Sequence, residues 1–469
     1  MYLSTRGGIE PVSFRDAVLM GLATDGGLLL PSAIPDATPK LDAWRQLPYA
    51  QLAAEVMALF VGDSIPRTAL DELTARSYAT FRDPEVTPTV QVGPVHILEL
   101  FHGPTLAFKD VALQFLGNLF EHILEQTGAT LNILGATSGD TGSAAIAGVR
   151  GKDRINVFIM HPHGRTSAVQ ERQMTTVLDA NVHNIAIDGT FDDGQRVLKE
   201  IFNDISFKTE FHLGAVNSVN WARILAQTVY YFHTAFRVCE RTGAPAIQAC
   251  VPTGNFGDVF AGYIACQMGA PIRRLILATN ENDILARFFN TGVYRQGEVR
   301  PTTSPAMDIQ IASNFERYLY YRTGSAPEQV RTLMNQFQRE GELRIDGCEE
   351  GIVAGVGTHE QTADIIRTYH KQHGYLLDPH TAVGVTVAER FLLNDIPTVC
   401  LATAHPAKFG QTIADIVKED VAHHALIDGL MDLPTRCEFL PAEKSAVQTF
   451  MRQTLKRCDL EPRVCKAIS

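Results

Sequence analysis

The sequence predicts an α/β protein with two doubly wound parallel-sheet subdomains, preceded by a helical N-terminal segment. From Val95 onward, short apolar runs alternate with amphipathic helical patterns, which indicates parallel sheets with helices on both faces. Two glycine-rich loops each stand between an apolar run and a helical pattern. Folds of this kind bind ligands at the carboxyl ends of their strands, where such loops lie.

The predicted N-terminal segment, residues 1–94, consists mostly of helices. Ser13 and Asp16 have the spacing of a capping box in front of the apolar run "AVLMGLA". Pro66 suits the first turn of a further helix over residues 66–81. The stretch "RDPEVTPTVQVGP" (82–94) is rich in proline and predicts a linker or an edge segment.

The α/β region is predicted over residues 95–430, with its smaller subdomain at roughly residues 130–215. Buried strands are expected at residues 131–136, 156–160, 182–187, 246–251, 273–279 and 397–403. Helical patterns lie between them at residues 166–178, 191–204 and 220–243. On the last of these helices we expect Tyr230, Phe232 and Phe236 to belong to the core. Residues 431–469 predict a C-terminal helical tail.

Bulk composition excludes several classes of partner. The 469 residues carry a net charge of −11, which argues against nucleic acid or an anionic membrane as the main partner. Eight scattered cysteines without a C-x-x-C pair, and an N-terminus without a signal-peptide core, predict a cytoplasmic protein. His161 and His163 lack a third ligand nearby, so no metal is expected. We expect a monomer or a small homo-oligomer.

The first glycine-rich loop, "TSGDTG" (137–142), follows the strand at 131–136 and opens a helix. Gly139 and Gly142 allow tight turns. Backbone N–H groups at a helix N-terminus bind anions, and the hydroxyls of Thr137, Ser138 and Thr141 add further donors.

The second loop, "PTGNFGD" (252–258), follows the strand at 246–251 and also opens a helix. Gly254 and Gly257 flank Asn255 and Phe256, and Asp258 is placed to cap the helix or to hold the loop together. Neither loop matches the P-loop or the dinucleotide-binding motif. Connection geometry explains either loop taken alone more readily, but two loops at the same end of parallel sheets favour anion binding.

The stretch "FHGPTLAFKD" (101–110) places one lysine after an apolar run. The ordinary interpretation of Lys109 is a solvated charge in a helix's first turn, paired with Asp110. However, the helix dipole disfavours lysine there, and Leu106, Ala107 and Phe108 would remove water from the amine. A desolvated amine is neutral more readily, and the neutral form is a nucleophile.

A desolvated lysine together with a separate phosphate loop is the arrangement that pyridoxal phosphate requires. Thr403 ends the strand at 397–403, where its hydroxyl could meet the ring nitrogen of the cofactor. An ordinary strand-end hydroxyl is the alternative interpretation of Thr403.

Seven motifs in order resemble those of the threonine synthase family, in its long bacterial and fungal form: "HGPTLAFKD", "TSGDTG", "NSVNWAR", "PTGNFGD", "MDIQIASNFER", "DPHTAVG" and "ATAHPAKF". The resemblance covers the chain from about Ser4 to about Lys408. It implies a fold-type-II pyridoxal-phosphate enzyme, similar in architecture to the tryptophan synthase β subunit. The implied reaction converts O-phospho-L-homoserine and water to L-threonine and phosphate, the last step of threonine biosynthesis.

The resemblance also implies a role for particular residues. Lys109 matches the catalytic Schiff-base lysine, and Thr403 matches the residue that faces the pyridine nitrogen. The cofactor phosphate is assigned to Gly254, Asn255, Phe256, Gly257 and Asp258. Asp140 stands where several relatives place asparagine beside the cofactor's ring hydroxyl, so that contact stays open. The substrate carboxylate is assigned to Thr137, Ser138 and Thr141, and the substrate phosphate to Asn217, Ser218 and Arg223.

Two other functions remain open at this point. A serine or threonine dehydratase of the same fold would share Lys109 and the cofactor loop, but would need no donors for a substrate phosphate. The segment "NSVNWAR" (217–223) therefore favours the synthase. A non-catalytic homologue could bind the cofactor and a phosphorylated ligand as a sensor or scaffold, although the sequence lacks nothing that catalysis requires.

Overall fold

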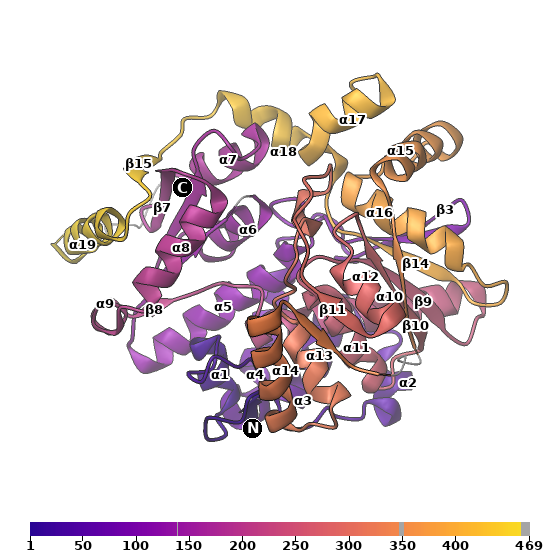
Figure 1. Cartoon of the computed structure of the whole chain (residues 1–469), viewed down its shortest axis with the longest axis horizontal. Helices are drawn as coiled ribbons and strands as arrows, with labels where there is room; N and C mark the ends of the chain where they lie inside the picture. Colours follow the sequence, from indigo (N-terminus) through magenta and orange to yellow (C-terminus); the bar gives the residue numbers. More distant parts are fainter. Residues whose placement is uncertain (138, 347–350, 461–469) are drawn as a thin grey trace. The chain divides into compact units, whose positions relative to one another are not determined.

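The computed structural model describes residues 1–137, 139–346 and 351–460 (Figure 1). The chain divides into two compact units. Unit 1 comprises residues 1–120 and 217–428, and unit 2 comprises residues 121–216 and 429–469. The division falls inside helix α5 (Lys109–Thr127), so this helix belongs to both units.

Unit 1 contains a six-stranded sheet that is parallel except at one edge. The edge strand β3 runs antiparallel to β4. It lies within residues 82–94, the stretch predicted as a linker or an edge segment. The predicted strands at 246–251, 273–279 and 397–403 correspond to β9, β10 and β14. In spatial order the strands are β13 (Ile352–Val356), β10 (Ile272–Thr279), β9 (Ile247–Pro252), β14 (Thr398–Ala402), β4 (Val95–Glu99) and β3 (Thr89–Val92).

Helices cover both faces of this sheet, as the sequence predicted. Every residue of β9 and β14 is buried, which explains why their sequences are continuous apolar runs rather than alternating ones. Leu275 of β10 lies under one pair of helices and Cys400 of β14 lies under the other. The two pairs are α10 (Trp221–Thr242) with α11 (Gly257–Gln267), and α15 (His359–His373) with α16 (Pro379–Ala388).

The N-terminal part of unit 1 is mainly helical. Ser13 caps α1 (Phe14–Met20) by accepting a hydrogen bond from the N–H of Asp16 at 3.1 Å, so the N-cap half of the predicted capping box is confirmed. The short antiparallel pair β1 (Tyr2–Ser4) and β2 (Leu29–Pro31) was not predicted. It forms through tertiary contact, because the Tyr2 hydroxyl donates to the carbonyl of Phe60 in α3 at 3.0 Å.

The other helical elements of unit 1 range from single 3-10 turns to the 14-residue helix α14. None of the described helices combines the length and the apolar composition needed to cross a membrane. These elements are η1 (Thr38–Lys40), α2 (Leu41–Trp44), α3 (Tyr49–Val61), η2 (Gly62–Ser64), α4 (Arg67–Tyr78), α12 (Ile284–Thr291), η3 (Pro305–Met307), α13 (Phe315–Arg322), α14 (Pro327–Glu340), η4 (Glu389–Phe391), η5 (Pro406–Phe409), α17 (Gly410–Val417) and α18 (Ala425–Asp428). Strands β11 (Val293–Arg295) and β12 (Glu342–Arg344) pair with each other.

Unit 2 contains a five-stranded sheet whose strands are all parallel. In spatial order they are β15 (Glu438–Pro441), β7 (Val182–Asp188), β6 (Ile155–Pro162), β5 (Leu131–Ala136) and β8 (Leu213–Gly214). The helical elements are α6 (Asp140–Val149), α7 (Ala168–Thr175), α8 (Phe191–Phe202), α9 (Ile205–Glu210), η6 (Gly429–Asp432) and α19 (Lys444–Leu460). Side chains from α8, α9 and α19 pack with Phe158 and Met160 of β6 in one core.

The C-terminal residues complete unit 2. The sequence predicted a helical tail, but the chain forms strand β15 before helix α19 (Figure 1). β15 extends the sheet beside β7, and Val447 and Met451 of α19 are fully buried in the core described above. The strand was not foreseen because its four residues are mostly exposed and its pairing partner lies far away in the sequence.

Candidate active site

Lys109 is the first residue of helix α5 and follows a tightly held turn. Leu106 in this turn has a φ of +62°, a backbone conformation that leucine rarely adopts. Asp110 holds the turn by accepting hydrogen bonds from the N–H and the hydroxyl of Thr105, both at 2.7 Å. The Nζ of Lys408 donates to the carbonyl of Thr105, also at 2.7 Å.

These contacts change the interpretation of the residue after Lys109. Asp110 is fully buried, and burial raises the pKa of its carboxyl group, while Thr105 and Lys408 act to lower it. Its carboxylate points back toward the turn and the buried Lys408, so the residue serves to shape the segment in front of Lys109. Sequence reasoning considered Asp110 only as a surface partner of Lys109 and did not single out Lys408, although both residues belong to motifs that it had identified.

The lysine segment is joined directly to the segment that carries Thr403. Ala107 pairs with Ala404 in an antiparallel bridge, and the N–H of Phe108 donates to the carbonyl of Thr403 at 2.8 Å. Lys109 is partly buried, with its Nζ 4.8 Å from the centroid of the Phe108 ring. The structure therefore brings together the two residues predicted to hold the two ends of the cofactor ring system.

The loop at 253–257 leads from β9 to the N-terminus of α11. Phe256, which precedes the helix, has a φ of +64°, and a Cβ on Gly254 would lie 2.4 Å from the carbonyl oxygen of Ala306. Among the described residues, no acceptor is found for the backbone N–H groups of residues 254–257. Open N–H donors at the start of an 11-residue helix fit a bound phosphate group.

Asp258 lies beneath this loop and accepts hydrogen bonds from two tyrosines of α10. The hydroxyls of Tyr230 and Tyr231 donate to its Oδ1 at 2.5 and 2.8 Å, while its Oδ2 has no partner among the described residues. Burial raises the pKa of Asp258 to about 6, and the two tyrosines and the Lys109 ammonium act to lower it. Tyr230 is buried, as predicted for the helix core, and its hydroxyl also supports the loop.

A buried histidine holds the other side of the loop, and sequence reasoning missed it. The Nε2 of His380 accepts a hydrogen bond from the N–H of Ala306 at 3.2 Å, and its Nδ1 lies 3.0 Å from the carboxylate of Asp378. Because Nε2 accepts, the proton of the neutral ring is on Nδ1 and points to Asp378. This pair positions the Ala306 backbone that closes on Gly254.

The segment 217–223 is tied to the cofactor loop by Asn314. The Nδ2 of Asn314 donates to the carbonyls of Ser218 and Asn255, at 3.2 and 3.1 Å. The Ser218 hydroxyl lies 2.9 Å from that of Ser313. The carbonyl oxygen of the Asn217 side chain is buried and has no hydrogen-bond partner in the described part of the chain.

Arg223 occupies the first turn of α10 and is buried. Burial lowers the pKa of its guanidinium to about 10, so the group stays protonated at neutral pH. A buried cation of this kind suits an anionic ligand, because a fork of N–H donors grips two oxygens at once.

The first glycine loop belongs to unit 2. The Thr137 hydroxyl accepts hydrogen bonds from the N–H groups of Gly139 and Gly142, at 3.1 and 3.2 Å, and so closes the loop. Asp140 accepts from the Nε2 of Gln170 at 2.9 Å, and Thr141 is partly exposed. Ser138 lies outside the described residues.

The arrangement in unit 1 fits pyridoxal phosphate. It offers a partly buried lysine amine, a strand-end hydroxyl on the adjoining segment, and unused backbone N–H groups for a phosphate. A family model described as pyridoxal-phosphate dependent enzyme matches residues 82–401. The fold and the site define a fold-type-II pyridoxal-phosphate enzyme, and its cofactor is pyridoxal phosphate.

Two further family models identify the family within this class. Threonine synthase N terminus matches residues 1–78, and Threonine synthase, C-terminal, matches residues 381–451. The threonine synthase of Schizosaccharomyces pombe is 46% identical over 453 residues, covering 88% of each chain. The chain therefore belongs to the threonine synthase family.

Solved structures agree with this assignment. A pyridoxal-phosphate-bound threonine synthase from Brucella melitensis is 44% identical, with a TM-score of 0.92 over 97% of this chain and 99% of that one. The yeast threonine synthase structure is 42% identical, with a TM-score of 0.93 and the same coverage. Both relatives are matched over nearly their whole length, so the likeness includes the N-terminal segment and the C-terminal residues.

Proposed function

We propose that this chain acts as a threonine synthase, converting O-phospho-L-homoserine and water to L-threonine and phosphate with Lys109 as its catalytic residue. The observation that carries the proposal is the joined pair of segments bearing Lys109 and Thr403, in the same unit as a helix N-terminus with open N–H donors. The family assignment supplies the reaction, and these contacts supply the residues.

We assign the cofactor to residues of unit 1. The N–H groups of Gly254, Asn255, Phe256 and Gly257 would hold its phosphate, and the Thr403 hydroxyl would meet its ring nitrogen. Asp258 supports the loop from below, through Tyr230 and Tyr231, rather than touching the phosphate. When bound, pyridoxal phosphate supplies an electron sink that acidifies the C–H bonds near the substrate's amino group.

Lys109 would anchor the cofactor and then move protons at its Nζ. The turn held by Asp110 and Lys408 fixes the start of α5, so the amine is delivered from a rigid segment. Partial burial of Lys109 favours the neutral amine, whereas the Phe108 ring, 4.8 Å from Nζ, favours the ammonium through a cation–π contact. The Asp258 carboxylate attracts the Lys109 ammonium, and the ammonium in turn acts to lower the pKa of Asp258.

We assign the substrate's two anionic groups to two different segments. Arg223, with Asn217 and Ser218, would bind the phosphate, because its buried guanidinium remains charged at neutral pH. Thr141 and Ser138 would bind the carboxylate, and Thr137 would shape that loop through its hydrogen bonds to Gly139 and Gly142. Asp140, held by Gln170, would lie beside the ring hydroxyl of the cofactor.

We also propose a cytoplasmic protein without a nucleic-acid or membrane partner. The net charge of −11 supports the second point. Among the described residues, Cys239, Cys250, Cys266, Cys400 and Cys437 form no disulfide, which suits a reducing compartment.

The decisive experiment incubates the purified protein with O-phospho-L-homoserine and measures threonine and inorganic phosphate separately. We expect equal amounts of both products. In a parallel incubation with serine or threonine, formation of ammonia and a 2-oxo acid, with no phosphate released from O-phospho-L-homoserine, would indicate the dehydratase instead. Binding without turnover would indicate the non-catalytic homologue.

Two variants test the residue assignments. Lys109→Ala should abolish turnover and the visible absorbance of the protein-bound cofactor, and retained turnover would refute the role of Lys109. Arg223→Ala should raise KM for the substrate by 100-fold or more, on the order of 3 kcal/mol, with the cofactor absorbance unchanged. Loss of the cofactor from Arg223→Ala would mean that the two phosphate sites have been exchanged.

A further inference from the structure

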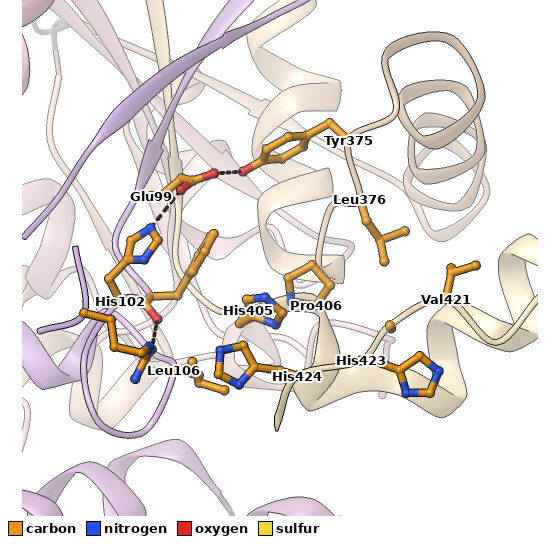
Figure 2. A pocket seen from close by; sticks show the side chains of 13 residues that line it. Glu99, His102, Leu106, Tyr375, Leu376, His405, Pro406, Val421, His423 and His424 are labelled. Atoms are coloured by element: carbon orange, nitrogen blue, oxygen red, sulfur yellow. Dashed lines mark hydrogen bonds and ion pairs between the residues drawn. The ribbon is translucent and has the colours of Figure 1, made fainter. Parts of the chain in front are cut away.

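Unit 1 contains a cavity of about 400 Å³ whose wall is rich in basic side chains (Figure 2). Arg82, His102, His405 and His424 line it, together with apolar residues such as Phe101 and Leu106. None of the residues assigned above to the cofactor or the substrate lines this cavity. The cavity is therefore a separate feature, and the proposed reaction leaves it unexplained.

Two imidazoles of the cavity are fixed in the same tautomer by hydrogen bonds from the backbone. The Nδ1 of His405 accepts a hydrogen bond from the N–H of Ala407, and the Nδ1 of His424 accepts from the N–H of Leu426, both at 3.1 Å. A nitrogen that accepts carries no proton, so each neutral ring has its proton on Nε2. Neither Nε2 has an acceptor among the described residues, and the ring centroids are 4.8 Å apart.

Arg82 adds a permanent positive charge to this pair. Its backbone N–H donates to the carbonyl of His102 at 3.0 Å, and its Nη2 donates to the carbonyl of Phe101 at 3.2 Å. Burial, followed by the effects of His424 and Arg82, lowers the pKa of His405 to about 4. The pKa of His424 is lowered by burial and then by Arg82, so the cluster repels additional protons.

The acidic groups near the cavity are already engaged or act weakly. Glu99, the carboxylate in the wall, accepts hydrogen bonds from the Nε2 of His102 and the hydroxyl of Tyr375, both at 2.8 Å. Asp378 raises the pKa of His405 and Asp428 raises that of His424, but burial and the basic groups dominate in both cases.

His423 also lines the cavity, but its ring is held by carboxylates rather than by the backbone. Its two ring nitrogens lie 3.3 Å from Asp420 and 3.6 Å from Asp428, and Figure 2 shows its ring directed away from His424. The cavity therefore presents N–H donors from Arg82, His405 and His424, while the carboxylate of its described wall is occupied by other partners.

We propose that this cavity binds a small oxyanion, of the phosphate, sulfate or carboxylate class, between the Arg82 guanidinium and the Nε2–H groups of His405 and His424. Such an anion accepts charge-assisted hydrogen bonds from these N–H donors and pairs with the positive charge of the Arg82 guanidinium. The apolar part of the wall, including Phe101 and Leu106, strengthens these bonds by lowering the local dielectric constant.

Bound oxyanion would tie together segments that stand next to the proposed catalytic residues in the chain. Leu106 precedes Lys109 in the tight turn, and His405 follows Thr403, with the N–H of His405 donating to the carbonyl of Leu106 at 3.0 Å. An anion that binds the folded protein alone raises its stability by mass action. The site does not depend on the proposed reaction, so it can be tested without the substrate.

The test measures the melting temperature of the cofactor-loaded protein during titration with sodium sulfate or sodium acetate, with sodium chloride at equal ionic strength as the salt control. Three single variants are compared with the wild type. Arg82→Ala removes the cation. His424→Asn keeps an acceptor for the N–H of Leu426 but deletes the Nε2 donor. His423→Asn is the matched control, because its ring faces Asp420 and Asp428.

We expect sulfate or acetate to stabilise the wild type and His423→Asn with equal half-saturating concentrations, beyond the effect of chloride. Arg82→Ala and His424→Asn should raise the half-saturating anion concentration tenfold or more. Identical titration curves for all four proteins would refute the site. If Arg82→Ala fails to fold, the pair His424→Asn and His423→Asn decides the question, because their substitutions differ by one position.

Crystals of the cofactor-loaded protein grown with selenate locate the anion directly. An anomalous peak between Arg82 and His424 would support the proposal. Selenate bound elsewhere, with this cavity empty, would refute it.

Discussion

The loops at residues 137–142 and 253–258 have the same layout, yet they offer different groups to a ligand. In each, a threonine follows a parallel strand, and an aspartate lies in the first turn of the next helix. The first glycine is two positions after Thr137 and one position after Thr253. The hydroxyl of Thr137 accepts two N–H groups of its own loop. The hydroxyl of Thr253 instead donates backward to the carbonyl of Val251 at 2.7 Å.

This difference decides which backbone donors remain for an anion. In the loop of unit 2, Thr137 uses the N–H groups of Gly139 and Gly142, so the loop is closed from within. In the loop of unit 1, the N–H groups of residues 254–257 have no acceptor within the described residues. A strand, a glycine loop and a helix therefore permit anion binding, and the hydrogen bonds of one hydroxyl determine how much of that capacity is available.

The largest expected effect is a pH-dependent loss of stability caused by Asp258, which is buried beside the hydroxyls of two tyrosines. Its pKa is about 6 in the folded protein, against an ordinary value of 3.8 for an aspartate, so its stabilising contribution is present below pH 3.8 and is lost as pH rises through 6. From pH 4 to pH 7 the cofactor-free wild type should lose about 2 kcal/mol relative to Asp258→Asn. Urea unfolding of both proteins across this range measures the difference, and parallel curves would contradict it.

Glycine substitutions test how rigidly each loop is enclosed. A Cβ at Gly254 would lie 2.4 Å from a backbone oxygen, whereas a Cβ at Gly139 would meet the side-chain amide of Gln170 at 2.6 Å. Backbone cannot yield as a side chain can, so Gly254→Ala should weaken cofactor binding by about 10- to 100-fold, or 1–3 kcal/mol. Gly139→Ala should leave cofactor binding within about threefold of the wild type.

Cofactor titration followed by visible absorbance measures both glycine variants. If Gly254→Ala and Gly139→Ala lost equal cofactor affinity, the Ala306 carbonyl would be no more rigid a neighbour than the Gln170 side chain.

Replacing each strand-end threonine tests the hydroxyl that distinguishes the loops. Thr137→Val leaves the N–H of Gly139 without its acceptor and the N–H of Gly142 with only the carbonyl of Gly139. It should raise KM for O-phospho-L-homoserine by roughly 5- to 30-fold, or 1–2 kcal/mol, with cofactor absorbance retained. Thr253→Val removes a single bond to Val251 and should change KM by less. A larger effect on KM from Thr253→Val than from Thr137→Val would contradict the claim that the Thr137 hydroxyl holds its loop more than the Thr253 hydroxyl does.

The smallest expected effect is that of Tyr230→Phe. The substitution keeps the buried ring and removes one of the two hydroxyls that bind Asp258, so it should cost about 1 kcal/mol of stability and weaken cofactor binding less than Gly254→Ala does. Thermal unfolding and cofactor titration measure the two quantities. An unchanged stability would mean that Tyr231 alone supports Asp258.

Much of this protein could be predicted because its elements obey local rules. The strands at 131–136 and 246–251 are buried on both faces and therefore appear as continuous apolar runs. The cap at Ser13 depends on a residue only three positions away. Strand β15 could not be predicted, because it is exposed and exists through pairing with β7.

The candidate site divides in the same way. Lys109 and the glycine loop were visible as local patterns of lysine, glycine and apolar residues. The groups that hold them were not, because Lys408 reaches Thr105 across 303 positions and His380 reaches Ala306 across 74. A buried lysine or histidine in a motif was the available signal, and it did not indicate the partner.

Local sequence was sufficient to determine the alternation of strands and helices, the position of the two glycine-rich loops and the lysine at the start of α5. These features depend on side-chain period, glycine content and helix capping, which act over a few residues. Tertiary structure alone decided that Asp110 turns toward Thr105, that Asp258 rests on two tyrosines, and that basic side chains converge beside His424. Such arrangements depend on burial and on hydrogen bonds between distant segments, and packing determines both.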